Sequence, residues 1–140
     1  MRKLGLRERY IGTYVSAESA SNYIDAQGII NSANNIKTEL EEFSNLSSDV
    51  KNAGSDLNSS TLCIDGKDCS PLVEDVATLI TTQYTSMLGN LDQIIAAAEN
   101  VYNSKQDEYN QIARYRDQQE ANRRAAMRAN RRAAMRASSN

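Results

Sequence analysis

Apolar residues in the second half of the chain recur at alternating intervals of four and three. The series comprises Val73, Ala77, Ile80, Tyr84, Met87, Leu91, Ile94, Ala98 and Val101. This spacing places an apolar stripe along one side of an α-helix, and the stripe leaves water only by packing against another helix. Ser70 suits an N-cap and Pro71 suits the first helical position, so we predict a helix over residues 71–118.

A second stripe lies earlier in the chain and predicts a helix over residues 10–58. Its main series is Ile29, Ile36, Phe43, Val50 and Leu57, and a weaker series is Ala26, Ala33, Leu40, Ser47 and Gly54. Two long helices joined by about a dozen residues must run antiparallel to bury both stripes. We therefore predict an all-α fold, a long coiled-coil-like two-helix hairpin. Because a lone hairpin has little core, we expect a partner to complete it to a helical bundle.

The predicted hinge, residues 59–70, contains both cysteines of the chain. Cys63 and Cys69 flank Asp65-Gly66, a pair of residues typical of turns. We predict that the two cysteines form a disulfide if the protein reaches an oxidising compartment, and two free thiols remain the alternative. The chain has no histidine and the cysteines are not spaced C-x-x-C, so we predict neither a metal site nor a cofactor.

Charge is distributed unevenly along the chain. Residues 1–9 carry four basic groups and one acid, net +3, and residues 121–140 carry six arginines and no acid, net +6, so residues 10–120 carry −11 of the total of −2. The arginines are Arg123, Arg124, Arg128, Arg131, Arg132 and Arg136, within a duplicated "ANRRAAMR".

Residues 119–140 thus form a basic tail, either helical or flexible. Three roles stay open for it: a solvated extension, a docking segment for an acidic protein, or a ligand for nucleic acid or an anionic membrane surface. We regard nucleic acid as a disfavoured partner, because the acidic body would repel a polyanion.

Six of the seven tyrosines lie toward the two ends of the chain, which meet at the open end of an antiparallel hairpin. They either fill space where the helices splay or form a partner-binding surface. The partner-interface candidates are Tyr10, Tyr14, Tyr102, Tyr109 and Tyr115. Serines and carboxylates occupy solvent-facing helical positions without a base beside them, so we predict a protein that is not an enzyme. No apolar stretch approaches the ~20 residues that span a bilayer, and no secretory signal is evident.

The stretches "GIINSANNIKTELEEFSNLSSDV" and "VATLITTQYTSMLGNLDQIIAAAENVYNSKQDEYNQI" carry a family resemblance. Over residues 10–118 the chain resembles the WXG-like (Esx) helical-hairpin proteins of bacterial type VII secretion, and most of all the small helical partners of LXG toxins. The family's Trp-x-Gly turn is absent. "YVSAE", Tyr14 to Glu18, fits the Y-x-x-x-[DE] secretion motif, which in the family follows the second helix.

The resemblance implies a non-enzymatic partner or targeting chaperone for export. Such a protein pairs with a second helical protein or with the N-terminal domain of a LXG toxin. It would be cytoplasmic before export, and secreted or held at the cell surface afterwards without a cleaved signal peptide. Two alternatives stay open: a self-assembling structural protein of a secretion filament or virion, and a nucleic-acid-binding accessory protein that uses the basic tail.

Overall fold

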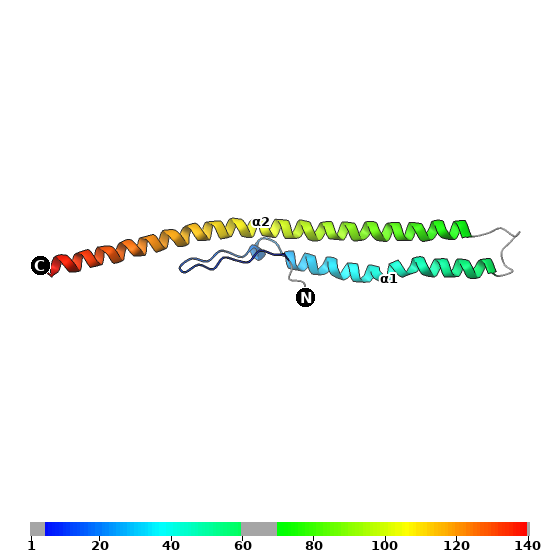
Figure 1. The fold of residues 1–140 in the computed structure, drawn as a ribbon, viewed down its shortest axis with the longest axis horizontal. Coiled ribbons are helices and arrows are strands. Elements are labelled where there is room, and N and C mark those ends of the chain that lie inside the picture. Colours follow the sequence, from blue (N-terminus) through cyan, green and yellow to red (C-terminus); the bar gives the residue numbers. More distant parts are fainter. Residues whose placement is uncertain (1–4, 60–69, 140) are drawn as a thin grey trace. The chain divides into compact units, whose positions relative to one another are not determined.

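The computed structural model describes residues 5–59 and 70–139, and its fold is an all-α helical hairpin (Figure 1). A short 3-10 helix, η1 (Ala20–Asn22), precedes α1 (Ala26–Ser59) and α2 (Ser70–Ser138). Among the described residues the only β-type pairing is an isolated antiparallel bridge between Ile11 and Ser16. The predicted disulfide between Cys63 and Cys69 lies outside the described residues.

The helix ends near the hinge agree with the sequence, whereas the start of the first helix does not. α1 ends at Ser59 and α2 begins at Ser70, each within one residue of the predicted helix end, and the residues between them lie outside the described part of the chain. The prediction that the first helix starts at residue 10 is wrong, because α1 starts at Ala26. The intervening residues, "YIGTYVSAESASNYID", include three serines, four β-branched residues and one glycine, which favour helices weakly. The basic tail is helical, since α2 continues without a break to Ser138.

The chain divides into two compact units, which are described separately below. One unit is Gln27–Ala97, and the other combines Met1–Ala26 with Ala98–Asn140. In the first unit α1 and the first part of α2 run antiparallel. Lys37 Nζ lies 2.8 Å from Asp92 Oδ1, and Ser47 Oγ donates to the Ala77 carbonyl at 3.1 Å.

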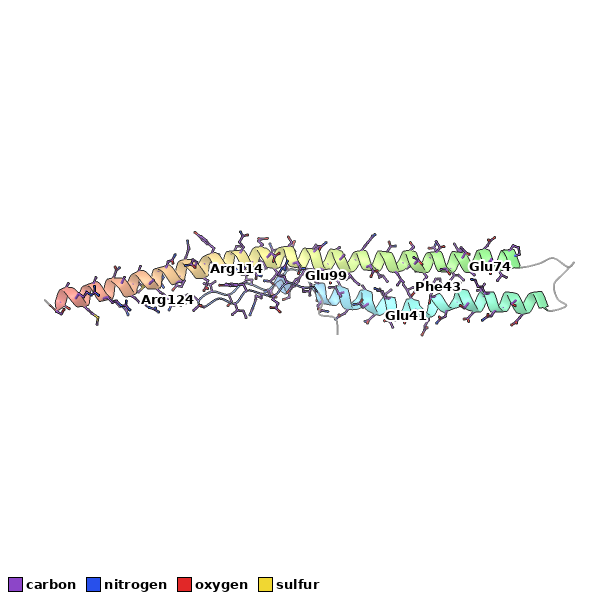
Figure 2. The ribbon with its side chains drawn as sticks, viewed as in Figure 1. Glu41, Phe43, Glu74, Glu99, Arg114 and Arg124 are labelled. Carbon is purple, nitrogen blue, oxygen red and sulfur yellow. The ribbon has the colours of Figure 1, made fainter. Side chains whose placement is uncertain are left out.

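Small residues occupy the centre of the contact between α1 and α2. Ala33 and Ala77 are 3% and 0% exposed, and Gly54 is buried against Val73. Phe43 is partly buried on the side of α1 that faces α2 (Figure 2). Small residues allow the two backbones to approach closely, so the weaker sequence series, which contains Ala33 and Gly54, forms the buried line of α1.

In the first half of α1 the main sequence series is not the most buried one, because the buried residues there include Ile30 and Ala33, 0% and 3% exposed. Ile29 and Ile36 remain 38% and 47% exposed. They lie beside the buried line because Ile29 is four residues before Ala33 and Ile36 is three residues after it, which places both on one side of Ala33.

In the second unit the N-terminal residues form an extended strap along α2 (Figure 1). We define the strap as residues 5–25. Its two arms are joined by backbone hydrogen bonds from Ala17 N–H to the Tyr10 carbonyl (2.9 Å) and from Gly12 N–H to the Val15 carbonyl (3.2 Å). The second arm ends in η1, which is capped by the Ser19 side chain.

Candidate functional site

Three side-chain amides of α2 hold the strap by its backbone. We call Asn103, Gln106 and Asn110 the amide ladder. Each amide oxygen accepts from a strap N–H, and each amide nitrogen donates to the carbonyl two residues earlier. The pairs are Arg7 and Gly5 for Asn103 (2.6 and 2.7 Å), Tyr10 and Glu8 for Asn110 (2.8 and 2.9 Å), and Ala20 and Glu18 for Gln106 (2.8 and 2.9 Å). The amides thus take the place that a neighbouring strand has in a sheet.

Two of the three amides of the ladder are buried, Asn103 is partly buried, and all three are bonded to the strap. Gln106 is 0% exposed and Asn110 is 5% exposed, and Gln106 Nε2 also donates to Asn110 Oδ1 at 3.0 Å. No buried side-chain nitrogen or oxygen in the described part of the chain lacks a partner. Buried polar groups of this kind stabilise a structure only when all their bonds are made, so the ladder fixes the strap in one register.

Asp117 anchors the tip of the strap. Its carboxylate accepts from the N–H groups of Tyr14 (2.6 Å), Val15 (2.9 Å) and Thr13 (3.2 Å), and from the Tyr10 hydroxyl at 3.1 Å. The bonds from Tyr14 and Val15 lower the pKa of Asp117, because they stabilise its charged form. The hydroxyl bond to Asp117 in turn raises the pKa of Tyr10.

Glycine is required at position 12 of this turn. A Cβ added at Gly12 would collide with the Val15 carbonyl oxygen and with the Asp117 carboxylate. The close approach of the strap backbone to α2 therefore depends on the missing side chain.

Three of the five predicted interface tyrosines contact cationic side chains within this unit. The Tyr10 ring lies 5.0 Å from the Arg114 guanidinium, the Tyr14 ring lies 4.5 Å from that of Arg124, and Tyr109 and Tyr23 both lie 5.1 Å from Lys105 Nζ (Figure 2 labels both arginines). These contacts fasten the strap to α2. Tyr102 is partly buried, and Tyr115 is 65% exposed.

The partner-binding role of the tyrosines stays a prediction, and so does the secretion motif. Tyr14 and Glu18 both lie in the strap rather than on a helix. The Tyr14 N–H is bonded to Asp117 and the Glu18 carbonyl to Gln106. Any factor that recognises "YVSAE" would meet it in an extended conformation.

One face of the Gln27–Ala97 unit is apolar and exposed, and ion pairs identify the opposite face. Lys37 and Asp92 pair across the two helices, so their sides of α1 and α2 belong to one face. Lys51 and Glu74 pair at 3.9 Å on that same face.

The apolar residues lie on the other side of each buried line. Ile36 lies three residues after the buried Ala33, and Lys37 lies four residues after it. On a helix these two positions are on opposite sides of the line of buried residues. In the same way, Ile94 lies three residues after the buried Leu91. Ile29 lies four residues before Ala33, and Met87 lies four residues before Leu91. Both are therefore on the same side as Ile36 and Ile94. We call Ile29, Ile36, Met87 and Ile94 the apolar face; they are 38%, 47%, 40% and 48% exposed.

The arginines of the tail divide into a paired and an unpaired set. Glu120 accepts from Arg123 and Arg124, at 2.7 Å each, and these bonds lower the pKa of Glu120 to about 2. The other four, Arg128, Arg131, Arg132 and Arg136, are exposed and form no ion pair within the part of the chain that the structure describes.

The described residues offer little to a small ligand. A shallow cavity of about 180 Å³ lies between the strap and α2, lined in part by Val15, Tyr109, Ile112 and Arg116. It is smaller than the ~300 Å³ at which ligand pockets begin. Two larger hollows, of about 590 Å³ beside Glu120 and about 400 Å³ beside Lys105, are more open to solvent. Over residues 5–59 and 70–139 no cluster of three or more His, Cys, Asp or Glu is placed to hold a metal ion. No described helix has an apolar stretch long enough to cross a bilayer.

No protein-family model, curated protein or solved structure matches this chain.

Proposed function

We propose that this chain is a non-catalytic helical-hairpin protein that binds another helical protein along the apolar face. The observation that supports this proposal is the contrast between the two faces of the Gln27–Ala97 unit. One face has the cross-helix ion pairs of Lys37 and Lys51, and the other exposes Ile29, Ile36, Met87 and Ile94. A partner helix laid between α1 and α2 on that face would cover all four side chains and produce a three- or four-helix bundle.

The apolar face is large enough to place a partner but not to hold it alone. Burying a whole side chain of this size contributes about 1.5–3 kcal/mol, so four that are nearly half exposed contribute roughly 3–6 kcal/mol. Association itself costs at least ~4 kcal/mol. The partner must therefore add contacts of its own, and Leu46, Val76 and Leu79, which are 42%, 40% and 58% exposed, provide further apolar surface.

The family resemblance suggests which partner this is. In the proposal the chain acts in type VII secretion, as a partner or targeting chaperone for a second small hairpin protein or for the N-terminal domain of a LXG toxin. The all-α hairpin and its uncovered apolar face are consistent with that role. A second copy of the chain on the same face would instead make it a self-assembling structural protein.

The test measures complexes of the full chain with the helical products of its neighbouring genes, by co-purification and mass determination. Ile36→Glu combined with Ile94→Glu should weaken such a complex by at least a hundredfold, because it would bury two unpaired carboxylates. Asn34→Glu combined with Thr85→Glu is the matched control, since it adds the same charge on the opposite face. Circular dichroism should show the same helix content for all three proteins.

Three outcomes decide the matter. Loss of the complex in the Ile36/Ile94 variant alone supports the proposal. A homo-oligomer that the same variant dissociates assigns the face to self-assembly instead. A chain that stays monomeric at micromolar concentration with every neighbouring product, or a complex that both variants retain, refutes the apolar face as an interface.

A further inference from the structure

Beyond Arg124, whose guanidinium lies 4.5 Å from the Tyr14 ring, no contact between α2 and the strap is present among the described residues. We call residues 121–138 the tail helix. Every residue from Asn122 to Ser139 is exposed, and the last hydrogen bonds between α2 side chains and the strap are those of Asp117. The tail helix is therefore not held in place by core packing, and its exposed side chains are available to a ligand.

The unpaired arginines of the tail helix share one side. At about 100° per residue, Arg128, Arg131, Arg132 and Arg136 fall within about 140° of the helix circumference. The duplicated "ANRRAAMR" rotates by about 80° per repeat, yet these four arginines still fall on one side because of their spacing. Arg123 and Arg124 are paired with Glu120. A separate side of the helix carries only short side chains, those of Ala126, Ala129, Ala133 and Ala137.

We propose that the tail helix binds the phosphates of a duplex nucleic acid through this arginine side. Guanidinium groups bind phosphate oxygens in a bidentate manner, and each basic side chain that neutralises a phosphate releases a condensed counterion. A few such contacts give non-specific dissociation constants of about 10⁻⁴ to 10⁻⁶ M at physiological salt. An exposed pair with a protein carboxylate is weak and releases no comparable number of counterions, so phosphate is the stronger ligand.

The other polyanions fit less well. A single strand is bound mainly by stacking on aromatic side chains, and the tail has none. A membrane surface requires large apolar side chains on the non-basic side, where the tail helix has alanines.

The acidic body is a weaker obstacle than the net charge suggests. Arg128 is eight residues beyond Glu120, a distance of about 12 Å along the helix, which exceeds the Debye length of ~8 Å at physiological salt.

The experiment measures the binding of the full chain to fluorescent 20-base-pair duplexes by anisotropy, at salt from 50 to 200 mM. One arm uses DNA, a second uses RNA of the same sequence, and a third uses vesicles containing phosphatidylserine. Four phosphate contacts predict a log–log slope of about −3.6, which is a loss of affinity of roughly 150-fold over this range. Arg128→Gln combined with Arg132→Gln should halve the slope and leave the helix content unchanged.

Lys37→Gln combined with Lys51→Gln is the matched control, since it changes the net charge equally but lies in the Gln27–Ala97 unit. Duplex binding whose slope falls only in the arginine variant supports the proposal, and the DNA and RNA arms show which duplex is preferred. The proposal would be overturned if no duplex bound at 50 mM salt, if both variants gave equal slopes, or if the chain bound the vesicles alone. None of these results bears on the apolar face, so this inference can fail while the proposed function stands.

Discussion

Replacing Gln106 by leucine tests whether the amide ladder holds the strap. Leucine is close to glutamine in size, so the change removes polar atoms without opening a large cavity. The Ala20 N–H loses its acceptor, and because Ala20 is 0% exposed, water cannot replace that acceptor. An unpaired buried donor costs about 1–3 kcal/mol, and the lost bond to the Glu18 carbonyl adds ~1 kcal/mol. We expect docking of the strap to weaken by about 2–4 kcal/mol.

Native-state hydrogen exchange measures this change directly. The Ala20 amide exchanges when the strap opens locally, so a loss of about 2–4 kcal/mol should speed its exchange by roughly 30- to 700-fold. Amides of the Gln27–Ala97 unit should exchange as in the wild type. Gln118→Leu is the matched control, because Gln118 lies on the same helix, is exposed, and bonds only to the Asn122 side chain at 3.0 Å.

An Ala20 amide as protected in Gln106→Leu as in the wild type would show that the ladder does not hold the strap. Equal acceleration in the Gln118→Leu control would show instead that α2 itself has been loosened.

Three further predictions concern single positions. The pKa of Asp117 is lowered in the folded protein, so its bonds stabilise the docked strap fully at a pH above the ordinary pKa of 3.8. This stabilisation is lost as the pH falls through the lower pKa of the folded protein, and the protection of amides 13–15 from hydrogen exchange should fall in that range. Asp117→Asn should abolish this pH dependence. In urea unfolding, Gly89→Ala should stabilise by up to ~1 kcal/mol, since no atom lies within 4 Å of the new Cβ. Gly54→Ala should destabilise by ~1–3 kcal/mol, because its Cβ would meet the Val73 side chain at 2.5 Å, and a stabilised variant would contradict the close packing there.

The two helices, apart from the start of α1, could be predicted from the sequence because they depend on local signals. Ser70 and Pro71 mark the start of α2, and the spacing of four and three indicates a helix wherever it occurs. Which of two adjacent heptad positions is buried depends on how closely the helices approach. Large residues such as Ile36 suggested one position, but Ala33 and Gly54 permit a closer approach at the other.

The apolar pattern does not predict the strap, because the buried seam of α2 continues in polar residues where the strap lies against it. Asn103, Gln106 and Asn110 are themselves spaced three and four residues apart along α2, and the first of them lies five residues after Ala98. A helix could not have covered them, because its backbone N–H and C=O groups are already bonded within the helix, and two buried amides would have been left without partners.

An extended chain offers just the free backbone groups that a buried amide needs. The change from apolar to amide side chains along α2 therefore specifies a change of partner, from the helix α1 in one unit to the extended strap in the other. The same reasoning explains why α1 begins only at Ala26, since a helix over residues 10–25 would have left Gln106 and Asn110 buried without bonds. Replacing both amides by leucine should remove that restriction, so the buried seam would then favour a helix in place of the strap.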